Sequence, residues 1–276
     1  MPFSINSENN FFLRSFSKIQ NSQNVTFQRL ASMNRINSAK DDPAGLAIVN
    51  RVTAEISAVN QSVRNANDGI SFAQTAQSGL IQITSNLQRI RTLTVQASNS
   101  VVGDRNAIQN EIDQLAQENI RITDSSSFNG QAIFPKDNKS VSFQVGSDSN
   151  ADNQISVELK AVDSLNTVDV SSASKAQEAI GDIDAQIEQV SKQASNFGAI
   201  ENRLGATIAV NESTLINAQA SRSQISDTDV AKEISELIKN QILEKANIAI
   251  SAQANQSRKS ILSLLGIGIR QGMENK

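Results

Sequence analysis

A long run of apolar residues at helical spacing is the feature that most limits how this chain can fold. From Val49 onward apolar side chains recur at alternating intervals of three and four, the heptad pattern of a helix that packs on other helices at shallow angles. Asp42 suits the N-cap of such a helix and Pro43 its first position. We predict one helix from about Pro43 to Ala97, with a seam through Val49, Val52, Ile56, Val59, Val63, Ala66, Ile70 and Ala73, continued after a phase shift by Leu80, Ile83, Leu87, Ile90 and Leu93.

Other stretches carry the same helical period. Residues 98–104 predict a turn, and Asp104 can cap a second helix that returns antiparallel on the first. A third seam runs from Ala176 to Ile225. The two terminal segments also carry spaced apolar residues, among them Phe12, Phe16 and Ile19 near the start and Ile238, Ile242, Ile250, Leu264 and Leu265 near the end.

Between Ser125 and Lys160 the period changes to two. Val141, Phe143 and Val145 alternate with polar residues, and Ile155, Val157 and Leu159 do so again after a polar loop. This alternation predicts a small β-hairpin. The expected fold class is therefore mainly α, a long antiparallel helical bundle or coiled coil with a β-hairpin region.

Acidic connectors separate the terminal segments from the long helices. Asp41, Asp42 and Pro43 form the first connector, and Asp227 lies in the second, where residues 226–229 offer similar capping chemistry. A lone amphipathic helix cannot bury its own face, so the ends need each other or other subunits. We expect residues 1–42 with 226–276 to form one terminal helical domain and residues 43–225 to form a helical rod with the hairpin.

Composition removes several classes of function. The chain of 276 residues has no His and no Cys, which excludes imidazole bases, Ser-His-Asp triads, thiolate metal sites and disulfides. Its net charge of -3 comes without a basic block, so we expect no nucleic-acid partner. No apolar run reaches membrane-spanning length, and nothing resembles a secretory signal peptide, so composition alone gives the cytoplasm as default. We expect that the chain is not an enzyme and that it binds neither a cofactor nor a metal ion.

Two short motifs resemble ligand sites but depart from the pattern that such a site requires. Asp148, Asn150 and Asp152 mimic the start of a calcium loop, but Asn153 and Leu159 stand where glycine and a bidentate glutamate belong. A solvated hairpin loop is favoured. The glycines at 266, 268 and 272 follow a helix rather than a strand, so a flexible tail is favoured over a dinucleotide fingerprint.

Six motifs, in this order along the chain, resemble bacterial flagellin. They are "NRINSAKDDPAGLAI" (34–48), "RNANDGIS" (64–71), "LQRIRTLTVQASNS" (87–100), "FNG" (128–130), "FQVG" (143–146) and "SAQANQSRKSILSLL" (251–265). The resemblance covers nearly the whole chain. One departure is "QRLASMNRIN" (28–37) in place of the usual "ERLSSGLRIN", which puts Met33 where a glycine is usual.

The resemblance implies a structural subunit that polymerises into the flagellar filament used for swimming. The terminal helices would pair into the filament core, and the variable outer domains of larger flagellins look absent. Family members are exported unfolded by the flagellar type III apparatus without a cleaved signal peptide, which replaces the cytoplasmic default with an extracellular location. Implied partners are other flagellin subunits, the cap and hook-associated proteins, and an export chaperone for the C-terminal segment.

Arg89, Leu93 and Glu118 match, by this resemblance, the patch that the vertebrate Toll-like receptor for flagellin engages. The alternative interpretation is that the patch packs neighbouring subunits together. Thr92 replaces the acidic residue common in recognised family members.

Two other interpretations of the whole chain remain. The hook-filament junction protein of the flagellum shares flagellin-like ends and would form one short ring. A secreted helical binding module would stay monomeric and have ordered termini in solution.

Overall fold

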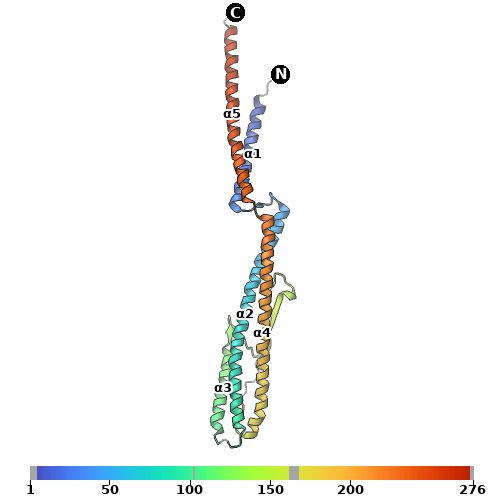
Figure 1. Ribbon diagram of the computed structural model, residues 1–276, viewed down its shortest axis with the longest axis vertical. Coiled ribbons are helices and arrows are strands. Elements are labelled where there is room, and N and C mark those ends of the chain that lie inside the picture. The colour runs from blue at the N-terminus through green and yellow to red at the C-terminus, as the bar shows by residue number, and fades with distance from the viewer. Residues whose placement is uncertain (1–4, 102, 162–167, 274–276) are drawn as a thin grey trace. The chain divides into compact units, whose positions relative to one another are not determined.

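The computed structural model describes residues 5–101, 103–161 and 168–273, which form five α-helices, one short 3-10 helix and two small antiparallel sheets (Figure 1). The chain divides into a terminal unit, residues 1–53 with 220–276, and a central unit, residues 54–219. These boundaries lie inside α2 and α4, further into the long helices than the domain limits expected from sequence. The elements are α1 (Ile5–Ser32), α2 (Pro43–Ala97), α3 (Arg105–Ser125), β1 (Ser127–Phe128), β2 (Gln131–Ala132), β3 (Lys139–Gln144), η1 (Ala151–Asn153), β4 (Gln154–Leu159), α4 (Ala173–Ser226) and α5 (Val230–Met273).

Helix α2 begins and ends at the residues predicted from the heptad pattern. At its start the Asp42 carboxylate accepts a hydrogen bond from the Gly45 amide at 2.9 Å, which satisfies one of the free N–H groups of the first turn. A Cβ atom at Gly45 would collide with the Asp42 carboxylate and with Ile36. The glycine in "DDPAG" therefore lets the capping side chain fold back over the helix.

The central unit is a helical bundle in which α3 lies antiparallel beside α2, as predicted (Figure 1). Asp104 caps α3 by accepting from the Ala107 amide. Arg89 on α2 pairs with Glu111 on α3 at 2.6 Å, and Asn86 donates to Asn119 at 2.7 Å. The buried apolar core includes Ile83, Leu87, Ile90, Leu93, Ile112, Ile183 and Leu204.

The predicted hairpin is formed by β3 and β4, with Val141 opposite Val157 and Phe143 opposite Ile155. Ile155, Val157 and Leu159 are buried, while the residues between them are exposed. Phe72 on α2 lies within 6.4 Å, centroid to centroid, of the rings of Phe128, Phe143 and Phe197, so aromatic packing holds the β region on the helices.

A second small hairpin, β1–β2, was not predicted. Its turn is Asn129-Gly130, both with positive φ, 50° and 77°. Asn-Gly is a strong signal for a tight hairpin turn, because both residues tolerate the left-handed region. The "FNG" motif therefore contained the signal, but the flanking strands have only two residues each, too few for alternation to show.

The expected flexible tail is wrong, because α5 continues to Met273 through the three glycines at 266, 268 and 272. Glycine lowers helix propensity by about 1 kcal/mol but keeps its N–H donor, so it weakens a helix without ending it. Composition alone could not distinguish a weakened helix from a coil.

Two helical glycines of the central unit are expected to respond in opposite ways to a larger side chain. A Cβ atom at Gly69 would lie 2.9 Å from Leu204 Cδ1 and 3.3 Å from the Phe143 ring, whereas nothing lies within 4 Å of one at Gly205. Gly69→Val should destabilise the unit by about 1–3 kcal/mol through overpacking. Gly205→Ala should stabilise it by about 1 kcal/mol through helix propensity. Thermal unfolding followed by circular dichroism would measure both, and a shift in the same direction would contradict this packing.

Candidate assembly site

The terminal unit consists mainly of α1 and α5, which run antiparallel and pack against each other (Figure 1). Polar contacts link them along their length. Asn247 donates to the Ser15 hydroxyl at 3.0 Å, Gln23 donates to Glu244 at 2.8 Å, and Arg29 pairs with Glu233 at 3.3 Å. The helix pair is thus held in register by side-chain hydrogen bonds.

The face of α5 that packs on α1 is mostly polar. Between Val230 and Ile250 its less exposed positions share one face at helical spacing; they are Glu233, Glu236, Leu237, Asn240, Glu244 and Asn247, and five of these six are polar. On α1 the corresponding side chains include Ser15, Gln23, Thr26 and Arg29. We call these two sets the polar seam. Among the described residues of the terminal unit, Ile36 is the one apolar side chain that is buried.

Many apolar side chains lie instead on the outside of this unit. On α5, residues Ile234, Ile238 and Ile242 are spaced by four and turned away from the polar seam, with exposed fractions of 45%, 51% and 61%. We call these three residues the isoleucine face. Other exposed apolar side chains of the unit include Phe11, Leu13, Val25, Phe27, Met33, Val230, Leu243, Ile248 and Ile250. An open groove along the α1–α5 pair has Leu13, Val25, Leu243 and Ile250 in its lining.

The terminal residues that the sequence predicted for assembly fall into two groups, which differ in how far their side chains are exposed. Phe12, Phe16 and Ile19 are half-buried on α1, at heptad positions shared with the polar seam. Ile238, Ile242 and Ile250 are exposed on α5. Leu264 and Leu265 belong to helix α5, but their side chains fall outside the described part of the structure.

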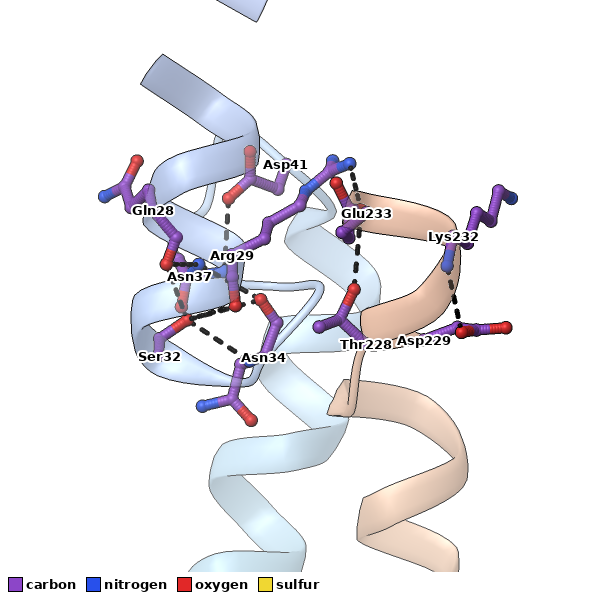
Figure 2. Close-up of polar contacts among 10 residues, drawn as sticks. All are labelled: Gln28, Arg29, Ser32, Asn34, Asn37, Asp41, Thr228, Asp229, Lys232 and Glu233. Atoms are coloured by element: carbon purple, nitrogen blue, oxygen red, sulfur yellow. Dashed lines mark hydrogen bonds and ion pairs between the residues drawn. The ribbon is translucent and has the colours of Figure 1, made fainter. Parts of the chain in front are cut away.

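The two connectors of the terminal unit are bonded to each other through their backbones. The Arg35 amide donates to the Ser226 carbonyl at 2.6 Å, and the Thr228 amide donates to the Met33 carbonyl at 3.1 Å, on either side of a β-bridge between Asn34 and Asp227. We call these contacts the connector clamp. Figure 2 shows Arg29 and Glu233 close to it, with the Thr228 hydroxyl 3.4 Å from the Glu233 carboxylate. The two terminal segments are therefore joined where α1 ends and α5 begins.

The acidic connector residues have distinct contacts. Asp41 accepts hydrogen bonds from the Asn37 amide and from the Ser38 amide and hydroxyl, at 3.0–3.1 Å (Figure 2 draws the first of these). Asp229, rather than Asp227, caps α5, by accepting from the Lys232 amide at 3.1 Å. Asp227 accepts from the Ser223 hydroxyl at 2.6 Å. The capping signal in residues 226–229 was present, but its two aspartates could not be told apart by type.

The Asp41 contacts should make the connector sensitive to acid. The Asn37 amide, followed by the Ser38 hydroxyl, stabilises the charged carboxylate and lowers the pKa of Asp41. Because the folded pKa is depressed, this stabilisation is present above the ordinary aspartate value of about 3.9 and is lost as pH falls through the lowered value. Carboxyl-carbon NMR should show Asp41 titrating below the ordinary range, and an ordinary or raised midpoint would contradict these contacts.

Arg89, Leu93 and Glu118 do not form one exposed patch. Leu93 is only 3% exposed and belongs to the core of the central unit, because it occupies the heptad seam of α2. Arg89 pairs with Glu111, and Glu118 pairs with Arg121 on its own helix at 2.6 Å, which lowers the pKa of Glu118. A surface role for Leu93 does not fit this burial.

Residues of the polar seam were missed by the sequence reasoning. Arg29, Glu233 and Asn240 lie at the spacing of three and four that marks a helix interface, but they are polar, and the search followed apolar residues. Their helical spacing is the signal in the sequence that could have indicated them.

The geometry defines a class: a structural protein of long helices whose paired ends meet through polar side chains and expose apolar ones. No helix in the described ranges combines the length and apolar content needed to cross a membrane. Comparison with known proteins narrows the class. Residues 3–139 match the bacterial flagellin N-terminal helical region, and residues 180–265 match the bacterial flagellin C-terminal helical region. The chain belongs to the bacterial flagellin family and is a structural subunit of the flagellar filament.

Individual relatives agree with this assignment. A flagellin of Halalkalibacterium halodurans is 41% identical over 246 residues, 86% of this chain and 90% of the relative. The flagellar filament 33 kDa core protein of Treponema phagedenis is 36% identical over 275 residues, 92% and 96% of the two chains. A crystal structure of Bacillus cereus flagellin is similar over 53% of this chain and 88% of that chain, at 24% identity and a TM-score of 0.49. The family assignment rests on the sequence matches.

Proposed function

We propose that this flagellin polymerises by burying the exposed apolar side chains of its terminal unit between copies. The observation that carries the proposal is the inverted arrangement of that unit, with the polar seam inside and the isoleucine face outside. The central unit has the opposite, ordinary arrangement, with a continuous apolar core. A helix pair of this kind gains stability when a neighbouring copy covers its outer face.

The free energy gained by covering the isoleucine face can be estimated from the apolar surface area that is buried. Fully burying an isoleucine side chain contributes about 1.5–3 kcal/mol, at about 25 cal/mol per Å². The three residues of the isoleucine face are roughly half exposed, so covering them would contribute about 1 kcal/mol each. The translational and rotational entropy that a subunit loses on assembly opposes this gain, so several such contacts are needed.

The proposal is tested by electron microscopy of purified protein mixed with short filament seeds. The full chain is compared with a copy that lacks the residues before Asp41 and after Asp227, and therefore lacks both α1 and α5. Filaments from the full chain alone would support polymerisation through the terminal unit. Filaments from both chains, or from neither, would overturn it.

The remaining features are proposed from the family. The subunit is exported by the flagellar type III apparatus without a cleaved signal peptide, acts outside the cell and has no enzymatic activity. It assembles with the cap and hook-associated proteins, and an export chaperone holds its C-terminal segment. The inner domain is proposed to comprise residues 1–42 with 226–276 and the outer helical domain residues 43–225, without a variable outer domain. Terminal helices that order fully only in the polymer would suit this route.

The hook-filament junction protein remains the alternative to a filament subunit, and it is not favoured. The two flagellin family matches and the filament core protein among the relatives point to a long polymer. Seeded growth also separates the two, because a junction protein would give one short ring.

For Arg89 and Glu118 we propose subunit packing and, at the same surface, engagement of the Toll-like receptor for flagellin. Both side chains are exposed enough for contact, at 54% and 43%. A receptor-reporter assay with soluble monomer tests the second role, and silence at high dose would reject it.

A further inference from the structure

Met33 has a backbone conformation that its side chain does not favour. It follows the last residue of α1 and has φ of 57°, in the left-handed region. Glycine is the usual residue at this position after a helix, because a Cβ atom makes the conformation costly. Among the described residues, the other non-glycine with positive φ is Asn129, an asparagine, which tolerates the region better.

The connector clamp fixes this conformation. The Met33 carbonyl accepts from the Thr228 amide at 3.1 Å, and two residues later the Arg35 amide donates to Ser226 at 2.6 Å. Because the backbone is held there, the direction of the Met33 Cα–Cβ bond is also held, while the flexible thioether beyond it can adapt to a partner surface. That side chain is 59% exposed, so most of it is not covered by its own chain.

Other exposed apolar side chains lie near Met33 along the chain and next to its clamp partner. Helix α5 begins at Val230, two residues after Thr228, the clamp partner of Met33, and Val230 and Ile234 are 38% and 45% exposed. Phe27, in the last part of helix α1, is 51% exposed. A single surface that covered this end of α1 and α5 would also reach Met33.

The chain's composition makes this residue chemically distinctive. It has no Cys, His, Trp or Tyr, so its 3 methionines carry the side chains that peroxides oxidise most readily. Met33 is the one whose side chain the structure describes. Oxidation converts a flexible apolar thioether into a polar sulfoxide, which disrupts apolar contacts.

We propose that Met33 contacts a second copy of this chain and is a modification site through which peroxide weakens assembly. The thioether sulfur attacks one oxygen of hydrogen peroxide and forms an S–O bond. The O–O bond breaks, the second oxygen leaves as water with both protons, and the sulfur loses an electron pair that the peroxide gains. The inference rests on the proposed function, since it requires polymerisation through the terminal unit.

The test is seeded polymerisation of untreated wild-type chain, peroxide-treated wild-type chain, and the variants Met33→Leu, Met33→Gln and Met33→Gly. Treated wild type and Met33→Gln should need about three- to tenfold more protein to extend seeds, because a polar group replaces an apolar contact. Met33→Leu should polymerise like untreated wild type and resist peroxide, although it keeps Met1 and Met273. Mass spectrometry should locate one added oxygen at Met33.

Met33→Gly separates contact from backbone strain. It relieves the left-handed strain, so the Thr228 amide should exchange more slowly in assembled filaments, yet seed extension should need more protein. If Met33→Gly or Met33→Gln extends seeds as well as wild type, or if treated wild type does, the inference is overturned while the proposed function stands. If untreated wild type fails to extend seeds, the proposed function itself has failed.

Discussion

Ile238→Asp with Ile242→Asp is expected to prevent seeded polymerisation at the concentrations at which wild type grows, while the monomer keeps its helical fold. Both side chains are more than half exposed and turned away from α1, so the substitutions break no described packing within the chain. In the polymer they remove about 1 kcal/mol of apolar burial each and add the cost of desolvating two carboxylates. The protein concentration needed for growth should rise about 100-fold or more, since every 1.4 kcal/mol is a factor of ten.

The matched control for this experiment is Ile238→Leu with Ile242→Leu, which keeps the apolar surface. We expect this variant to extend seeds within a small factor of wild type, because volume-conserving apolar exchanges are tolerated. Circular dichroism of all the monomers should coincide. Growth of the aspartate variant at wild-type concentration would show that the isoleucine face is not covered in the polymer.

Arg29→Ala is expected to loosen the pairing of α1 with α5. The Glu233 side chain is 10% exposed and that of Arg29 is 31% exposed, so removing the arginine leaves a nearly buried carboxylate without its cation. Breaking a buried pair costs about 3–5 kcal/mol, which we reduce to about 2–3 kcal/mol because Arg29 is partly solvated. Hydrogen exchange in assembled filaments should speed up about 30- to 100-fold for amides of both helices.

A double variant distinguishes loss of the ion pair from loss of packing. Arg29→Met with Glu233→Leu removes both charges and keeps apolar volume, and it should recover most of the protection lost in Arg29→Ala. Exchange in the central unit should be unchanged in both variants, which provides an internal control. Equal exchange in α1 and α5 for wild type and Arg29→Ala would show that the pair does not hold the helices together.

The sequence was sufficient for most of the helical fold. The regular spacing from Val49 to Leu93 predicted α2 because every turn of a long packed helix repeats the same requirement for an apolar seam. The β3–β4 hairpin was predictable because its six-residue strands alternate long enough to show a period of two. Caps at Asp42 and Asp104 followed from side chains that accept hydrogen bonds from free amides.

What could not be predicted depends on contacts between residues far apart in sequence. The connector clamp joins Asn34 to Asp227 through backbone groups, which leave no mark in residue type. The burial of Leu93, by contrast, follows from its place in the predicted apolar seam of α2, and it conflicts with the receptor patch that the family resemblance implied. The polar seam was not predicted because apolar periodicity assumes that the covered face of a helix is apolar, and in the terminal unit most of the covered side chains are polar.

The most direct measurement of the central claim is a cryo-EM reconstruction of filaments grown from this chain, at a resolution that shows side chains. The account predicts that Ile234, Ile238 and Ile242 pack against residues of a neighbouring copy, with Arg29 still paired to Glu233 inside the same copy. A reconstruction in which the isoleucine face borders solvent, or in which α1 and α5 take no part in contacts between copies, would contradict it.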